Sequence, residues 1–166
     1  MFMSKSLENL MAAFAGESQA FQKYSAFAVQ ADKEGFAQVA KLFRAAAAAE
    51  KVHAGNHLRA AGKILTTKDN LQEAIDGETY EFEQMYPPMI ADAQAEGNKA
   101  AERTFTMANE VEKTHARLYK EALDNLGNNQ AADIYVCPVC GETVVGSLPD
   151  NCPVCKAAGK MFVKID

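Results

Sequence analysis

All four cysteines of this 166-residue chain lie in its final segment, residues 133–166, as two Cys-x-x-Cys pairs. The pairs are Cys137 with Cys140 and Cys152 with Cys155. A segment this short rarely folds on an apolar core alone, so a bound metal is the expected source of its stability. Four thiolates at this spacing predict a closed tetrahedral site, which zinc and iron can both occupy.

The rest of the chain is expected to be helical, because alanine, glutamate, glutamine, lysine and leucine dominate it. Glycine and asparagine interrupt this pattern and divide it into four long helices. The expected helices span residues 4–33, 36–61, 70–96 and 98–126. Short joints at Gly35 and Gly97 make the helices on either side antiparallel, and a polar linker precedes strand-forming residues after Asp133.

Two local features refine the third expected helix. Asn70 followed by Glu73 resembles a capping box, which would open the helix at residue 70. Pro87 and Pro88 lack amide hydrogens, so two carbonyls one turn earlier lose their helical partners. We therefore expect a kink near the two prolines.

Glutamate and histidine recur at one spacing in the helical part. The pairs are Glu50-x-x-His53 and Glu112-x-x-His115, and further acids are Glu17 in the first helix and Glu78 and Glu81 in the third. Residues three apart share a helix face, so each pair points a carboxylate and an imidazole to the same place. A single pair of this kind is usually solvated, but several bare carboxylates cannot be buried together without cations. The set therefore predicts a two-metal carboxylate centre of iron or manganese.

Charge and hydropathy exclude other classes of function. The formal net charge of −5 argues against a nucleic-acid partner. No apolar stretch approaches the roughly 20 residues of a membrane helix. Lys5 and Glu8 fall where a signal peptide needs apolar residues, so we expect a cytoplasmic protein whose thiols stay reduced and bind metal.

Taken together, these motifs resemble the rubrerythrins. The resemblance is carried by residues 15–20, 50–53, 77–81, 85–87 and 112–115, together with both cysteine pairs. It implies a mainly α fold, with a four-helix ferritin-like di-iron bundle in residues 1–130. A small C-terminal β rubredoxin-like domain would follow in residues 131–166, with one iron in its four-cysteine site, although zinc fits the same ligands.

The resemblance also implies how the irons are held. Glu50 and Glu112 would bridge the two ions of the di-iron site. Glu17 would bind one ion as a terminal ligand, and Glu78 and His115 would bind the other. The four cysteines would hold the third iron.

Four residues of this chain match catalytic positions of the family. Glu81 and His53 would exchange as ligands of the first iron, with Glu81 bound in the oxidised state and His53 in the reduced state. Tyr24 and Tyr86 would hydrogen-bond near the centre. The sequence departs from the family after the first cysteine pair, where Glu142 replaces an aromatic residue that is common there.

The implied activity is reduction of hydrogen peroxide to water in oxidative-stress defence. Electrons would come from NADH through a separate reductase, often by way of rubredoxin, and would pass through the iron held by the four cysteines. The implied assembly is a homodimer or a higher homo-oligomer, with domain-swapped forms known. Two alternatives remain open: a ferritin-like protein that oxidises or stores iron, and a zinc-ribbon protein that binds a partner.

Overall fold

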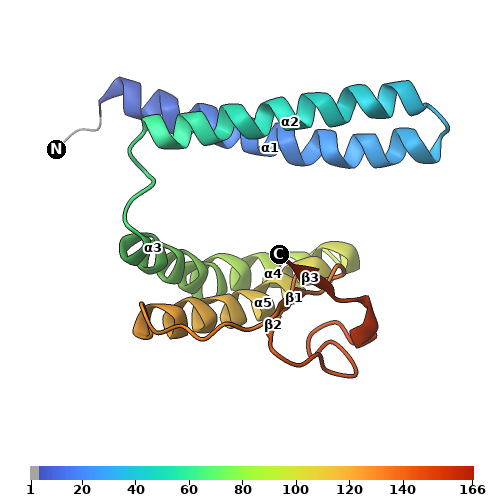
Figure 1. The fold of residues 1–166 in the computed structure, drawn as a ribbon. Helices are drawn as coiled ribbons and strands as arrows, with labels where there is room; N and C mark the ends of the chain where they lie inside the picture. The colour runs from blue at the N-terminus through green and yellow to red at the C-terminus, as the bar shows by residue number, and fades with distance from the viewer. Residues whose placement is uncertain (1–3) are drawn as a thin grey trace. The chain divides into compact units, whose positions relative to one another are not determined.

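The structure is a computed structural model that describes residues 4–166 (Figure 1). The chain divides into two compact units, of which the first ends at Leu65 and the second is Thr66–Asp166. Over the described residues the chain is mainly helical, with five α-helices and a small C-terminal sheet. This confirms the fold class expected from the sequence. No described helix is long and apolar enough to cross a membrane.

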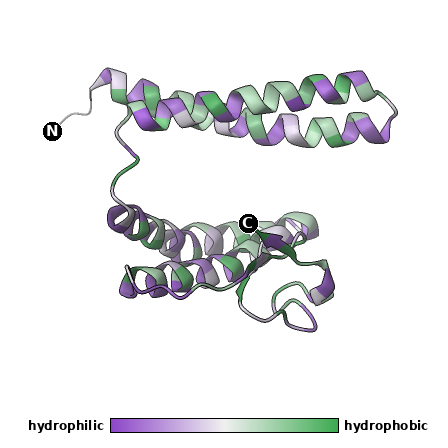
Figure 2. Ribbon diagram, viewed as in Figure 1, coloured by the Kyte–Doolittle hydropathy of each residue, from purple (hydrophilic) through white to green (hydrophobic). Residues whose placement is uncertain are grey.

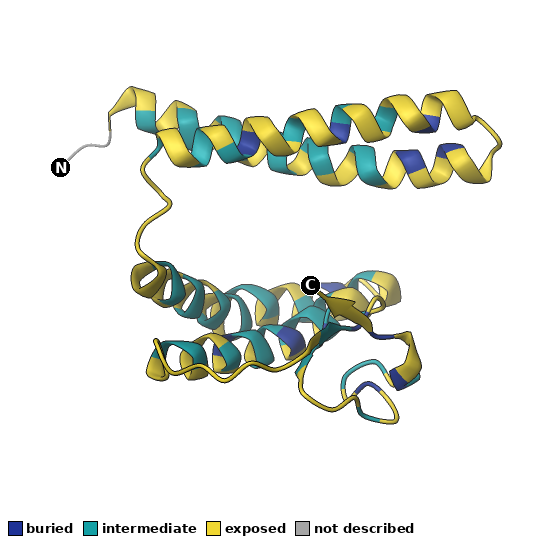
Figure 3. Cartoon of the chain, in the orientation of Figure 1, coloured by how far each residue is buried: buried dark blue, intermediate teal, exposed yellow. Residues whose placement is uncertain are grey.

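The first unit is a hairpin of two antiparallel helices, α1 (Lys5–Lys33) and α2 (Ala37–Ala60). Ser4 caps α1 by accepting a hydrogen bond from the Leu7 amide. The buried positions between the helices are all small. They are Ala28, Ala31, Ala40, Ala47 and Ala54. Larger apolar side chains stay exposed along the hairpin, and Leu42 is 67% accessible (Figures 2 and 3).

The second unit begins with α3 (Thr67–Tyr80), which starts earlier than the sequence predicts. The Thr66 hydroxyl accepts a hydrogen bond from the Asp69 amide at 3.2 Å and donates one to the Asp69 carboxylate at 2.6 Å. This satisfies the free amides of the first turn. The predicted capping box at Asn70 is therefore wrong, because Asn70 lies inside the helix that Thr66 already caps.

The third predicted helix is interrupted by a π-helical turn, Glu81–Met85, before it continues as α4 (Tyr86–Ala95). The Tyr86 amide donates to the Glu81 carbonyl, five residues back. Pro87 and Pro88 follow at the start of α4, where their missing amide hydrogens cost little. The break expected at the prolines thus takes the form of one wide turn just ahead of them. The last helix, α5 (Lys99–Asp124), is capped by Asn98.

The cysteine segment forms a three-stranded antiparallel sheet of order β2-β1-β3. The strands are β1 (Ile134–Val136), β2 (Thr143–Val145) and β3 (Val163–Ile165). Its core is Cys137, Cys152 and Phe162, which are almost fully buried. Strand β2 contacts α5 of the same unit. The domain boundary predicted at residues 130 and 131 falls in the linker between α5 and β1, and it stays a prediction.

Gly159 offers a test of how tightly the cysteine segment is packed. A Cβ atom added there would overlap the Pro149 carbonyl oxygen, a backbone atom that cannot rotate away. We expect Gly159→Ala to destabilise this segment by about 3 kcal/mol or more in a denaturant titration. Gly146→Ala is the matched control, because its added Cβ meets no atom and only its positive φ of 87° is unfavourable, at about 1–2 kcal/mol. Equal losses in the two variants would contradict the packing.

Candidate metal centres

Three groups of side chains bring metal-binding atoms within 4.8 Å of one another in the part of the chain that the structure describes. They are Glu17, Glu50 and His53; Glu78, Glu112 and His115; and Cys137, Cys140, Cys152 and Cys155. We call the first two the N-terminal trio and the C-terminal trio. Each trio lies within one unit and combines ligands from two helices of that unit.

The N-terminal trio takes Glu17 from α1 and both other residues from α2. The Nδ1 atom of His53 lies 2.8 Å from the Glu50 carboxylate, as expected for residues one turn apart. The two side chains differ in exposure, since His53 is 53% accessible and Glu50 only 19%. The imidazole therefore sits at the rim of the trio and the carboxylate lies within it.

The C-terminal trio is more enclosed. His115 on α5 places Nδ1 2.7 Å from Glu112 of the same helix and 3.8 Å from Glu78 on α3. All three side chains are at most one-quarter accessible. One imidazole nitrogen and two carboxylates thus converge on one point, which is a donor set that suits iron or manganese.

Burial and charge repulsion perturb the acids of the C-terminal trio. Burial, reinforced by repulsion from the Glu112 carboxylate, raises the pKa of Glu78 to about 7, although His115 opposes the shift. Burial and Glu112 also raise the pKa of Glu81. These carboxylates are therefore hard to ionise side by side, and a bound cation would remove the repulsion.

Of the four residues predicted to take part in catalysis, His53 belongs to the N-terminal trio and the other three belong to neither trio. Glu81 is on the π-helical turn, outside the 4.8 Å group. Burial raises the pKa of the Tyr86 hydroxyl, and the carboxylates of Glu81, Glu112 and Glu78 add to the effect, which places this tyrosine beside the acids. In the other unit, Tyr24 packs its ring against two phenylalanines of the hairpin. The catalytic roles of these residues stay predictions.

The four cysteines are free thiols whose sulfur atoms cluster tightly. Cys137 and Cys155 have their sulfurs 3.6 Å apart, and so do Cys140 and Cys152. A tetrahedron of sulfurs around an ion at about 2.3 Å has edges of about 3.8 Å, so the cluster is the right size for one metal. The segment therefore holds a preformed four-thiolate site.

The two Cys-x-x-Cys loops have the same backbone shape. Gly141 follows the first pair with φ of 88°, as its position in the sequence predicts, and its amide donates to the Cys137 carbonyl. Lys156 follows the second pair with φ of 66°, and its amide donates to the Cys152 carbonyl. Sequence reasoning missed this second turn, because lysine rarely adopts a positive φ. The signal that could have predicted this turn is position, because Lys156 follows the second cysteine pair as Gly141 follows the first.

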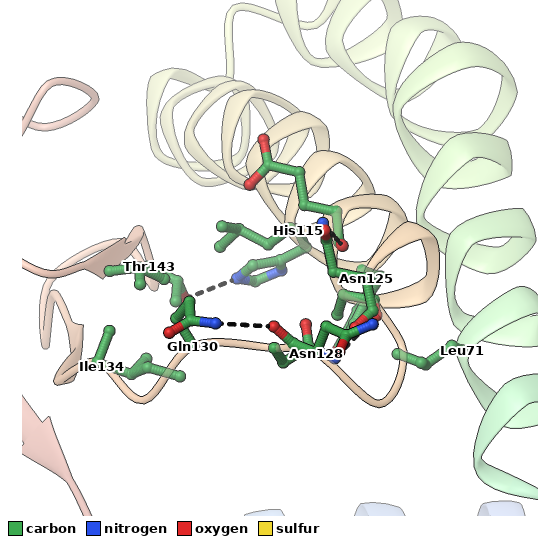
Figure 4. Close-up of a pocket in the computed structure, with 14 residues that line it drawn as sticks. Leu71, His115, Asn125, Asn128, Gln130, Ile134 and Thr143 are labelled. Atoms are coloured by element: carbon green, nitrogen blue, oxygen red, sulfur yellow. Dashed lines mark hydrogen bonds between the residues drawn. The ribbon is translucent and has the colours of Figure 1, made fainter.

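Two hydrogen bonds join the cysteine segment to α5 beside the C-terminal trio. His115 Nε2 lies 3.0 Å from the hydroxyl of Thr143, as Figure 4 shows. The Thr114 hydroxyl donates to the Glu142 carboxylate at 3.3 Å. Glu142 is only 6% accessible and burial raises its pKa, so this departure from the family pattern lies inside the contact. No sequence motif marks Thr143, which the fold alone brings to His115.

The donor sets fit the metals expected from the sequence. Helical di-iron proteins use one glutamate from each of two helices and a Glu-x-x-His pair from each of the other two. The two trios contain these six ligands. The cysteines add the four thiolates of a rubredoxin-like site. The protein thus carries a di-iron carboxylate site and a four-cysteine site.

Comparison with known proteins agrees with this assignment. The family described as Rubrerythrin matches residues 8–123, and the rubrerythrin rubredoxin-like domain matches residues 135–163. Rubrerythrin-2 of Clostridium acetobutylicum is 37% identical over 88% of this chain and 89% of its own. Nigerythrin of Nitratidesulfovibrio vulgaris is 37% identical over 92% of this chain and 83% of its own.

Solved structures show the same relationship. A structure titled as the fully reduced, all-ferrous state of nigerythrin aligns with a TM-score of 0.61 and 34% identity, covering 99% of this chain and 89% of that one. The mixed-valence state of nigerythrin aligns with a TM-score of 0.60. The matched segments contain every ligand of the two trios and all four cysteines, and the chain therefore belongs to the rubrerythrin family.

Proposed function

We propose that this protein is a non-haem di-iron peroxidase that reduces hydrogen peroxide to water in defence against oxidative stress. The observation that carries the proposal is the pairing of a carboxylate–imidazole donor set with a four-thiolate site, joined by the His115–Thr143 hydrogen bond. Iron bound at these sites would supply the electrons that cleave the O–O bond. A rubredoxin or an NADH-dependent reductase would replace those electrons at the four-cysteine site.

We further propose that the two trios serve one di-iron centre. Each trio has only three ligands, which is half of the set that a helical di-iron protein uses. The ligands would come from one chain, or from two copies in a homodimer or a larger domain-swapped assembly. The α1–α2 hairpin exposes apolar side chains such as Leu42 and Val52. They support such pairing because contact with a second copy would remove their apolar surface from water.

The exchange of His53 for Glu81 follows from charge balance. Four carboxylates would balance the charge of two ferrous ions, so the uncharged imidazole of His53 would complete a neutral set. Two ferric ions would bring more positive charge, which the anionic carboxylate of Glu81 would partly compensate. The proposal is supported by the high exposure of His53 and by the place of Glu81 beside Glu112. Tyr24 and Tyr86 would orient ligands through their hydroxyl groups.

The metal content of the protein separates the candidate functions. We expect purified protein to hold two irons in the carboxylate site and one in the cysteine site, with a ferric-thiolate colour that dithionite bleaches. Metal analysis and a visible spectrum measure both. Glu112→Gln is expected to lose the first two irons and keep the colour, because Glu112 is not a ligand of the cysteine site. A colourless protein with one zinc per chain would contradict the proposed electron route.

Glu81 tests the ligand exchange. We expect Glu81→Gln to lower peroxide turnover about ten- to a hundredfold, because the amide keeps the shape of the side chain and loses its charge. Turnover is measured anaerobically with a chemical reductant. Glu83→Gln is the matched control, since Glu83 lies on the same π-helical turn but is exposed and belongs to neither trio. Full turnover by Glu81→Gln with its iron retained would rule out the exchange.

The raised pKa of Glu78 predicts proton release when metal binds. Below its pKa of about 7 this carboxyl group is mostly protonated, and an incoming cation must displace the proton. We expect ferrous iron to release more protons and to bind more weakly at pH 6 than at pH 8. Calorimetry in two buffers of different ionisation enthalpy measures the release. Glu78→Gln should not release the proton that the Glu78 carboxyl group contributes. Equal proton release by the unsubstituted protein at pH 6 and pH 8 would contradict the assignment of the release to Glu78.

A further inference from the structure

The contact between strand β2 and helix α5 joins a ligand of the C-terminal trio to the cysteine segment. His115 directs one ring nitrogen, Nδ1, at Glu112 and Glu78, and its other nitrogen, Nε2, lies 3.0 Å from Thr143 Oγ1. The two residues are 28 positions apart in the chain. The cysteine segment thus supplies the neighbour of the outer nitrogen of a metal-binding imidazole (Figure 4).

The direction of this hydrogen bond follows from the ligand chemistry. A nitrogen that binds a metal carries no proton, so an Nδ1-bound imidazole keeps its proton on Nε2 and donates it. Thr143 Oγ1 accepts that bond, and its own proton points to the Gly141 carbonyl oxygen at 3.3 Å. Gly141 directly follows Cys140. The Thr143 hydroxyl therefore lies between His115 of the C-terminal trio and the backbone next to Cys140 of the cysteine site.

The surroundings of the Thr143 hydroxyl decide which other groups could partner Nε2 of His115. His115 and Thr143 border a pocket of about 720 Å³ between α5, the linker and the sheet, whose wall includes Leu118, Ile134 and Val145. The wall also holds polar side chains, among them Glu121, Asn128 and Gln130, but the hydrogen bond that Nε2 makes in the structure is the one to Thr143. Without the hydroxyl, the partner of Nε2 would be pocket water, which exchanges and does not hold the ring.

We propose that Thr143 is a positioning residue that holds the His115 ring in its metal-binding orientation and couples the four-cysteine site to the di-iron centre. The coupling rests on the proposed function, whereas the orienting hydrogen bond does not. In the proposed route, each electron that crosses would oxidise a ferrous ion at the cysteines to ferric and reduce one ferric ion of the di-iron centre to ferrous. No covalent bond forms or breaks in this step. Both ends of the route lie in one compact unit of one chain.

A second hydrogen bond of the same contact provides the control. Thr114 donates to Glu142 at 3.3 Å and ties the residue just before β2 to α5, and this hydrogen bond involves no candidate ligand. Thr114→Val should therefore loosen the contact without changing the partner of His115. Thr143→Val removes the hydroxyl at nearly constant volume, in a strand where valine is favourable. Thr143→Ser restores the hydroxyl.

The first experiment observes the Nε2 proton of His115 directly. In zinc-loaded protein, NMR should show this proton exchanging slowly with solvent in the unsubstituted protein, in Thr143→Ser and in Thr114→Val. In Thr143→Val we expect exchange at least about tenfold faster. Unchanged protection in Thr143→Val would overturn the proposal. So would the lack of a protected proton in the unsubstituted protein, a result that does not depend on whether any variant folds.

The second experiment measures the coupling. Fully reduced iron-loaded protein is mixed with hydrogen peroxide, and the return of ferric-thiolate absorption reports electrons leaving the cysteine site. We expect this phase to be about tenfold slower in Thr143→Val, restored in Thr143→Ser, and slowed less by Thr114→Val. Equal slowing in both valine variants would reduce Thr143 to a docking contact and overturn the coupling. If the unsubstituted protein does not react with peroxide, the proposed function fails, and the NMR result still decides the role of Thr143.

Discussion

Repulsion between carboxylates that share a confined space is the constraint on which the chemistry of this chain depends. Glu78 and Glu112 are held together beside His115 with little solvent around them, and the pKa of Glu78 rises to about 7 as a result. Such an arrangement is unfavourable for the protein alone, because ionised groups lose hydration and repel each other. A bound cation would relieve this repulsion, which is the physical reason why the trio suits a metal ion.

The helices that carry the candidate ligands depart from tight, regular packing. The α1–α2 hairpin buries only alanines between its helices, which brings the backbones close and leaves the larger side chains accessible. In the second unit, the π-helical turn places Glu81 beside the trio just before the prolines start α4. Hydrogen bonds in a π-helical turn have poorer geometry than those of an α-helix, and such turns are frequent at functional sites. Ions bound by ligands from several helices would add stability to these lightly packed elements.

The four-cysteine site and the C-terminal trio are parts of one structural unit. The Cys-x-x-Cys loops shape the thiolate cluster through left-handed turns at Gly141 and Lys156. The chain that leaves the first loop brings Glu142, and then Thr143 at the start of β2, to α5. A single sequence segment therefore builds the thiolate site and contacts a ligand of the other site. The proposed electron route depends on this proximity, which a zinc ribbon simply attached to a helical domain would not need.

The sequence alone predicts the candidate ligands, because their spacing is a local property. Glu112 and His115 share a helix face wherever the helix lies, and two residues between cysteines suffice to form a thiolate loop. The start of α3 was misjudged because Thr66 and Asn70 are both good caps, and the hydrogen bonds that Thr66 makes with Asp69 decide between them. Only the tertiary structure revealed the partner of His115. Thr143 is 28 residues away, and the docking of β2 on α5, which no local pattern encodes, brings its hydroxyl to the ring.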